Sequence, residues 1–174
     1  IIINHNICAD KDKYNGIIPK DCKLQCGKEY TLIRDEFKNL VNKKKKGFDK
    51  NNINVFVAMG GADHSNINLR ILKALDIYNN LHINIATTTA NRNLQELEIY
   101  CQNKNHVTLY INTNQIAKLM IVSDFVIISP SVIANETLYL NLPLIAIKTA
   151  DNQNEMHQYL LKNNYISLEQ FNDI

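Results

Sequence analysis

The sequence predicts an α/β protein built on a Rossmann-like parallel sheet with helices on both faces. From residue 54 onward, short runs of apolar, β-favouring residues alternate with segments whose apolar residues recur at helical spacing. Gly, Asn, Asp, Ser and Pro separate these runs and mark turns. Such alternation is typical of βαβ units, whose parallel strands are buried on both faces.

The first fifty residues are the least regular part of the chain. Residues 1–3 look like the end of a strand, a polar loop follows, and a second short strand is predicted at Leu24–Cys26. Gly27 ends that strand, and residues 30–37 are predicted to form a docked loop that leads into a short helix. A chain of 174 residues with these features is most simply one compact domain.

The remaining elements are predicted in chain order from their apolar periodicity. Strands are expected at residues 54–58, 83–87, 107–111, 125–128 and 144–147. Helices are expected around residues 67–75, at 93–101, at 115–122, from residue 132, and at 153–162. Ser167 is predicted to cap a last short helix.

The most informative stretch is the strand at residues 125–128 with the turn and helix that follow it. Ser129, Pro130 and Ser131 form the turn, and Ser131 is predicted to be the N-cap of a helix whose free N–H groups suit an anion such as phosphate. Glu136 then lies about 7 Å further along the helix axis. A diphosphate on the amides and ribose hydroxyls on this acid would fit a nucleotide. The alternative is a solvated Glu136 in the electropositive half of the helix.

Two more turns are expected at the same edge of the sheet, where open α/β proteins bind ligands. Gly60 and Gly61 let the backbone approach a ligand closely, or else form a tight strand-to-helix turn with Asp63 as N-cap. The other turn contains Asn152 and Gln153.

Common nucleotide-binding signatures are missing from the sequence. There is no G-x-G-x-x-G, and the strand at residues 83–87 is followed by threonines without an acid for a ribose, so a nicotinamide enzyme is disfavoured. There is no G-x-x-x-x-G-K-[ST], which excludes a P-loop enzyme.

Bulk composition points away from nucleic acid and membrane partners. The net charge is +2, and the one basic run, at residues 43–46, is interpreted as a solvated loop. No apolar run approaches a membrane span or a secretory signal, and the four cysteines show no CxxC. A cytoplasmic protein with reduced thiols is expected.

Catalytic groups are scarce. The five histidines are scattered and are interpreted as surface or capping residues, with His64 the best candidate base among them. No Ser or Cys stands in a nucleophile elbow. No acidic cluster suits Mg²⁺, so neither a metal nor a cofactor is expected.

Several motifs together resemble a known family. They are YTLIRDEF at 30–37, MGGAD at 59–63, TTTANRNL at 87–94, IAKLM at 116–120, ISPSVIANETL at 128–138 and NQ at 152–153. In this order they resemble the C-terminal half of the UDP-sugar hydrolases of bacterial pseudaminic acid biosynthesis, which belong to the two-domain GT-B superfamily. The resemblance runs from about residue 3 to residue 165.

The resemblance implies both a reaction and a set of binding residues. The family removes UDP from UDP-2,4-diacetamido-2,4,6-trideoxy-β-L-altropyranose, a step towards glycans on flagellin and cell surfaces, and its C-terminal domain holds the UDP. The positions that match are Tyr30, Leu32, Arg34, Gly60, Gly61, Ser129, Ser131, Val132, Asn135, Glu136, Asn152 and Gln153. Glu136 would take the ribose hydroxyls, Ser131 and the following amides the diphosphate, and Arg34 with its neighbours part of the uracil pocket.

One departure from the family is large. Its catalytic histidine lies in a G-x-G-H motif of the N-terminal domain, and this chain has no such motif. The resemblance therefore implies residues 1–50 as an interdomain segment with first strands, residues 51–174 as the nucleotide-sugar-binding domain, and a missing catalytic domain as partner. A glycosyltransferase donor domain and a non-catalytic nucleotide-sugar-binding module remain alternatives.

Overall fold

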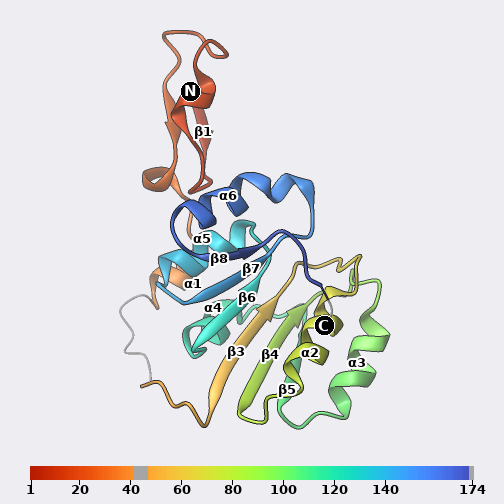
Figure 1. The fold of residues 1–174 in the computed structure, drawn as a ribbon. Coiled ribbons are helices and arrows are strands. Elements are labelled where there is room, and N and C mark those ends of the chain that lie inside the picture. Colours follow the sequence, from red (N-terminus) through yellow and green to blue (C-terminus); the bar gives the residue numbers. More distant parts are fainter. Residues whose placement is uncertain (41–46, 173–174) are drawn as a thin grey trace.

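A computed structural model describes residues 1–40 and 47–172, and the lysine run at residues 43–46 lies outside this range. Within it, a six-stranded parallel sheet has the order β5-β4-β3-β6-β7-β8 (Figure 1). Its strands are β3 (Ile53–Ala58), β4 (Leu81–Thr87), β5 (Val107–Ile111), β6 (Phe125–Ile128), β7 (Leu144–Ile147) and β8 (Ile166–Leu168). The helices are α1 (Asp35–Lys38), α2 (Ile67–Leu75), α3 (Leu94–Gln102), α4 (Ile116–Ile121), α5 (Val132–Tyr139) and α6 (Asn154–Lys162).

Both faces of the sheet are covered, as predicted. Along β3, Val55 and Val57 belong to a core that includes residues of α2 and α3. Phe56 and Ala58 point the other way, into a core formed with α1, α4, α5 and α6. This alternation explains why the strand is apolar and buried from Val55 to Ala58, since neither face reaches solvent there.

The strand order reverses between β3 and β6. The chain runs outward from β3 through β4 to β5, returns to pair β6 with β3, and continues through β7 to β8. This is the order of doubly wound nucleotide-binding sheets, in which ligands bind at the carboxyl ends of the strands beside the reversal. The fold class expected from the sequence is confirmed.

The first thirty residues form an arm that extends from the rest of the molecule (Figure 1). It contains two short parallel strands, β1 (Ile2–Asn4) and β2 (Leu24–Cys26), and the 3₁₀ helices η1 (Lys11–Tyr14) and η2 (Lys28–Tyr30). A third 3₁₀ helix, η3 (Asp151–Gln153), precedes α6. In the part of the chain that the structure describes, no helix is long and apolar enough to cross a membrane.

The predicted last helix is wrong. Residues 166–168 pair with β7 as the edge strand β8, in which Ser167 is buried while Ile166 and Leu168 are exposed. Ser167 therefore faces the protein interior and caps no helix.

Candidate functional site

A cavity of about 250 Å³ lies at the carboxyl ends of β3, β4, β5 and β6. Its position at the strand-order reversal is the one expected for a ligand of this fold. It is lined by Ala58, Gly60, Gly61, Ala86, Thr87, Thr88, Asn112, Thr113, Ile116, Ser129, Ser131 and Ile133. Four of the predicted site residues, Gly60, Gly61, Ser129 and Ser131, are thus brought together.

The glycine pair forms the tight turn after β3. Gly60 has a φ of +90°, and a Cβ added to it would meet no atom within 4 Å. A Cβ on Gly61 would lie 2.9 Å from Thr88 Oγ1, whose hydroxyl donates to the Gly61 carbonyl at 3.0 Å. Gly60 therefore leaves open space and supplies the positive φ of the turn, while Gly61 allows Thr88 to pack closely. A turn and a close approach to a ligand are both compatible with this geometry.

Asp63 caps the helix after this turn, although not from the N-cap position. Its carboxylate accepts from the amides of Ile67, at 2.7 Å, and Asn68, at 3.3 Å. The residue at the N-cap position is Asn66, in the left-handed region with a φ of 53°. Asp63 is thus occupied by α2 and is buried.

The turn after β6 differs from the prediction in one respect. Ser131 occupies the N-cap position of α5, but its side chain makes no capping hydrogen bond. Its hydroxyl lies 3.1 Å from the Ser129 hydroxyl instead. The first-turn amides of α5 are therefore not occupied by this side chain, and they remain suited to an anionic group from a ligand.

Sequence reasoning missed the part of the cavity formed after β4 and β5. Asn112, with a φ of 52°, donates its amide N–H to the Thr87 carbonyl at 3.0 Å and accepts from the Thr89 amide at 3.1 Å. These bonds join the two strand ends and place Thr88 and Thr113 at the cavity wall. Their position in the sequence could have identified these residues, because Thr88, Asn112 and Thr113 directly follow two adjacent strands at their carboxyl ends.

Glu136 forms a two-point ion pair with Arg34. Arg34 Nε lies 2.6 Å from Glu136 Oε1, and Nη2 lies 2.9 Å from Oε2. The Glu136 side chain is 3% exposed and that of Arg34 is 54% exposed, so the alternative of a solvated Glu136 is wrong. Glu136 itself does not line the first cavity, but it follows the lining residue Ile133 by three positions, less than one turn further along α5.

Arg34 is itself held in place by its neighbours. Its Nη1 pairs with Glu36 Oε1 at 2.7 Å, and its guanidinium lies 4.8 Å from the centroid of the Phe37 ring. The hydrogen bond to Glu136 is the main cause that raises the pKa of Arg34 above its ordinary value. The two predicted residues thus form one fixed charge pair.

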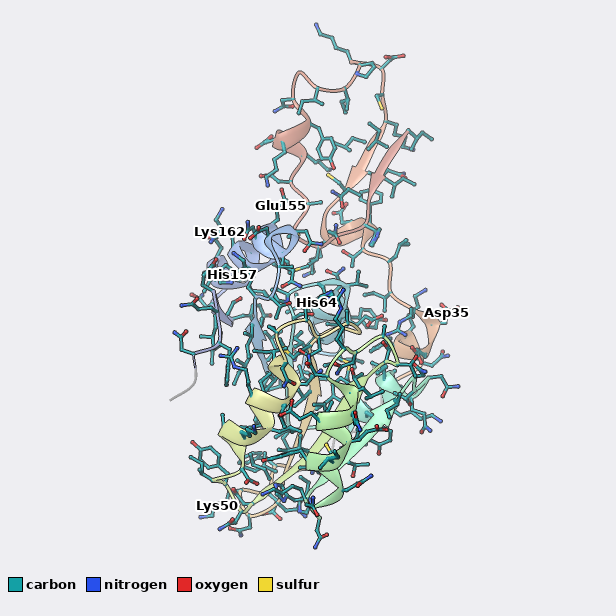
Figure 2. All side chains as sticks on the ribbon, turned by 90° about the vertical axis from the view of Figure 1, so that its right-hand side faces the viewer. Asp35, Lys50, His64, Glu155, His157 and Lys162 are labelled. Carbon is teal, nitrogen blue, oxygen red and sulfur yellow. The ribbon has the colours of Figure 1, made fainter. Side chains whose placement is uncertain are left out.

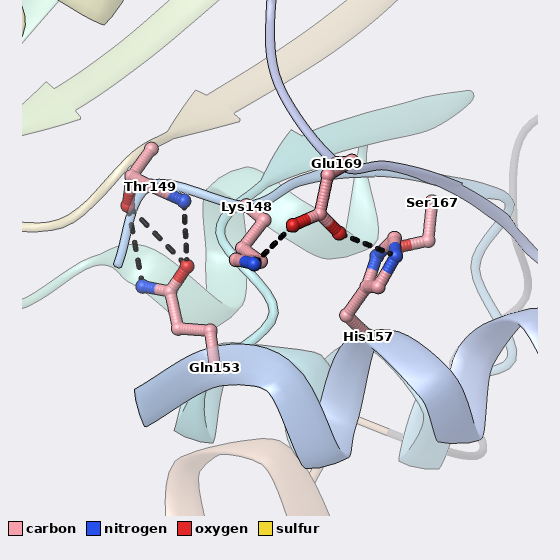
Figure 3. A network of polar contacts seen from close by, with 6 residues as sticks. All are labelled: Lys148, Thr149, Gln153, His157, Ser167 and Glu169. Atoms are coloured by element: carbon pink, nitrogen blue, oxygen red, sulfur yellow. Dashed lines mark hydrogen bonds and ion pairs between the residues drawn. The ribbon is translucent and has the colours of Figure 1, made fainter. Parts of the chain in front are cut away.

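Other predicted residues lie elsewhere. Gln153 folds back to accept from the Thr149 amide at 2.8 Å (Figure 3), and Asn135 lines a separate cavity. The remaining predicted residues line neither this separate cavity nor the one at the strand-order reversal. They are Tyr30, Leu32, Val132 and Asn152.

The histidines divide between surface and interior. His64, in the loop between β3 and α2, is exposed, and Figure 2 shows it apart from His157 on α6. His157 is buried, so its interpretation as a surface residue is wrong. Its Nδ1 lies 2.7 Å from Ser167 Oγ and its Nε2 lies 3.1 Å from Glu169 Oε2 (Figure 3). Glu169 also pairs with Lys148.

The His157 network joins elements and does not line the cavity. It connects α6 to β8 and to residue 169 just beyond that strand. Its order, with the serine on Nδ1 and the acid on Nε2, is the reverse of a hydrolase triad. The network therefore fixes the position of α6.

The donors at the first cavity fit a phosphate- and hydroxyl-bearing ligand. Backbone amides, serine and threonine hydroxyls and the Asn112 side chain surround it, and such groups bind phosphate and sugar oxygens. Within residues 1–40 and 47–172, no group of three or more His, Cys, Asp or Glu side chains could hold a metal ion.

The chain is similar in sequence to a UDP-sugar hydrolase. It is 36% identical, over 166 residues, to the UDP-2,4-diacetamido-2,4,6-trideoxy-beta-L-altropyranose hydrolase of Campylobacter jejuni, and the match covers 95% of this chain and 58% of the hydrolase. The resemblance stated from the motifs is thereby confirmed. The uncharacterized protein MJ1062 of Methanocaldococcus jannaschii is 27% identical over 145 residues, which are 78% of this chain and 29% of that protein. No family model matches the chain.

Two of the similar solved structures are glycosyltransferases. Spinosyn rhamnosyltransferase SpnG, complexed with spinosyn aglycone, matches with a TM-score of 0.54 at 15% identity, covering 69% of this chain and 32% of that one. A glycosyltransferase of kitacinnamycin matches with a TM-score of 0.51 at 12% identity, covering 73% and 33%. These matches establish the likeness of fold. The chain spans about a third of each transferase and 58% of the hydrolase.

Proposed function

We propose that this chain is the UDP-binding, C-terminal part of a nucleotide-sugar hydrolase with the GT-B fold, which releases UDP from UDP-2,4-diacetamido-2,4,6-trideoxy-β-L-altropyranose. The observation that carries the proposal is the 36% identity to such a hydrolase along 95% of the chain. The cavity at the strand-order reversal, with Glu136 less than one turn beyond the cavity-lining Ile133 in α5, supports the proposal.

In this proposal the first turn and the middle of α5 bind different parts of the nucleotide. The first-turn amides, beside Ser129 and Ser131, bind the diphosphate through hydrogen bonds and the positive end of the helix dipole. Glu136 binds the ribose. A carboxylate offers about four lone-pair positions, so the two bonds from Arg34 leave acceptor capacity for ribose hydroxyls.

The reaction needs a group from outside this chain. Water attacks either the anomeric carbon, so that its bond to the UDP oxygen breaks and UDP leaves, or the β-phosphorus, so that the P–O bond to the sugar breaks and the sugar leaves. A histidine of an N-terminal domain acts as general base and takes the proton of the water. The amides of α5 stabilise the negative charge of the departing UDP. Residues 1–50 then form the interdomain segment and first strands, and residues 51–174 form the nucleotide-sugar-binding domain. The proposed partners are a UDP-sugar and the N-terminal domain, in the synthesis of pseudaminic acid for flagellin and surface glycans.

A glycosyltransferase donor domain is the second candidate, because two of the similar solved structures are glycosyltransferases. It would bind the same nucleotide part in the same way and would pass the sugar to an acceptor instead of water. A non-catalytic nucleotide-sugar-binding module would also bind UDP. A G-x-G-H motif in the upstream sequence would favour the hydrolase over both.

Amide NMR spectra of the ¹⁵N-labelled chain test where a nucleotide binds. Addition of UDP is expected to shift the resonances of Gly60, Gly61, Val132 and Ile133 and to leave that of Lys50 unchanged, because Lys50 precedes β3 at the opposite edge of the sheet. Shifts confined to other parts of the chain, or no shifts with saturating UDP, would contradict the proposal.

A further inference from the structure

A second cavity, of about 380 Å³, lies between the arm, the segment before α1, α5 and the end of α6. It shares no lining residue with the first cavity. It is lined by Ile7, Lys28, Thr31, Ile33, Lys38, Asn135, Leu138, Tyr139, Tyr159, Asn163 and Tyr165. Its volume is in the range of small-molecule sites.

The helical phase of α5 separates the two cavities. Ile133 lines the first cavity and Asn135 the second, and two residues on a helix differ by about 200° in direction. Leu138 and Tyr139 follow Asn135 by three and four residues and therefore share its face. The second cavity is therefore on the side of α5 away from the first cavity.

One buried donor at this cavity lacks a partner. Asn135 is 1% exposed, and its Oδ1 accepts from the Ile7 amide at 3.3 Å. Its Nδ2 is buried and makes no hydrogen bond to any described residue. Since an unsatisfied buried donor costs free energy, such a group calls for an explanation. A ligand in the cavity would provide the missing acceptor.

The charge of the lining residues indicates what kind of acceptor this is. Two of them are lysines, Lys28 and Lys38, and none is Asp or Glu. Lys38 also pairs with Asp35, outside the cavity lining, at 2.8 Å. The cavity therefore offers ammonium groups and an amide N–H, which together favour an anion.

Apart from Thr31 and Asn163, the remaining wall is apolar and aromatic. Three tyrosines and the side chains of Ile33 and Leu138 supply flat and aliphatic surface. Burial is the main cause that raises the pKa of Tyr159, so its phenol keeps its proton and can donate. Such a wall suits a compact apolar body attached to the anionic group.

We propose that this second cavity binds a small organic anion. Its carboxylate or phosphate group accepts from Asn135 Nδ2 and from the lysine ammonium groups, and its apolar body lies against the tyrosines. Because Ile133 and Asn135 point in directions about 200° apart on α5, this ligand and a ligand in the first cavity would lie on different sides of one helix.

Calorimetric titration of the chain with phenyl phosphate and with phenylacetate tests the proposal and separates the two kinds of anionic group. Saturable binding of at least one of the two is expected. Inorganic phosphate, which has the anionic group alone, and benzyl alcohol, which has the aromatic body without the charge, are expected to bind more weakly. Lys28→Gln should weaken binding about threefold, because an exposed charge contributes little. Asn135→Leu should weaken it about tenfold, as for loss of one hydrogen bond to a charged group. Lys50→Gln, a matched change outside the cavity, should have no effect.

Three results would overturn the proposal. The first is no saturable binding of either anion up to about 10 mM, well above the millimolar range of weak specific ligands. The second is binding that neither cavity variant changes. The third is loss of binding when UDP is saturating, which would place the anion in the first cavity. If Asn135→Leu does not fold, as judged by circular dichroism, Lys28→Gln alone decides, because that side chain is exposed.

Discussion

Glu136 and Arg34 lie 102 positions apart in the chain and meet in a two-point ion pair. The buried carboxylate gains a partner that is fixed by Glu36 and by the Phe37 ring. A carboxylate in this position presents its remaining lone pairs in one direction, which is a requirement for selective recognition of ribose hydroxyls. The pair therefore connects the segment before α1 to the proposed nucleotide site.

Glu136→Ala is expected to weaken the binding of UDP by about 1.5–3 kcal/mol, because a hydrogen bond to a charged group is lost. Calorimetric titration of the variant and the parent chain measures the difference. Glu98→Ala, which removes a carboxylate from α3, is the matched control and should bind UDP like the parent. Equal affinity of Glu136→Ala and the parent would assign Glu136 a purely structural role.

Arg34→Met is expected to lower the free energy of unfolding by about 2–3 kcal/mol, because it leaves the Glu136 carboxylate buried without its cation. Urea unfolding followed by circular dichroism measures this. Lys13→Met is the matched control, since Lys13 pairs with Glu155 where both side chains are more than half exposed, and it should cost less. Equal losses for the two variants would contradict the importance given to the burial of Glu136.

At the level of residues, the sequence predicted which residues lie at the ligand-binding edge of the sheet better than it predicted which side chains contact each other. Gly60, Gly61, Ser129 and Ser131 were found because residues that follow adjacent parallel strands meet at one edge of the sheet. The partner of Glu136 and the burial of His157 depend on tertiary packing. Local patterns carry no information on such long-range contacts.

The strands and helices were predicted where their apolar pattern is strong. The bounds predicted for β5, β6 and β7 agree with the structure. The last strand was missed because its pattern is inverted: β8 buries Ser167 and exposes its two apolar residues, at an edge where pairing with β7 decides the conformation. Tertiary pairing overrides local propensity in such a short segment.

An ion pair joins α2 to the loop between α3 and β5 and predicts a dependence of stability on pH. Asp76, which follows α2, accepts from Lys104 Nζ at 2.5 Å. This hydrogen bond is the main cause that lowers the pKa of Asp76 below its ordinary value of 3.8. The stabilisation is therefore fully present above that value and is lost as the pH falls through the lower pKa of the folded state.

Melting temperatures of the parent chain and Asp76→Asn, measured from about pH 6 to about pH 2, test this. The parent is expected to melt higher at pH 6, and the difference should shrink as Asp76 becomes protonated in the folded state. A difference that stays constant over the whole range would show that Asp76 acts through something other than its charge.

At the scale of the whole molecule, the alternation of strands and helices predicted a parallel sheet covered on both faces, and the structure has one. The order of the strands could not be predicted from alternation alone, because it depends on where each crossover returns. That order places the reversal between β3 and β6, and with it the first cavity. The division into an interdomain segment and a nucleotide-binding domain stays a prediction.

Calorimetric titration of the purified chain with UDP, with NAD and CMP as controls, tests the central claim most directly. The proposed site predicts saturable, one-to-one binding of UDP, with NAD and CMP binding more weakly, because the site is assigned a uridine diphosphate and the chain lacks a dinucleotide fingerprint. Equal binding of all three nucleotides, or no binding of UDP at millimolar concentration, would contradict the claim that this chain is the UDP-binding part of a nucleotide-sugar hydrolase.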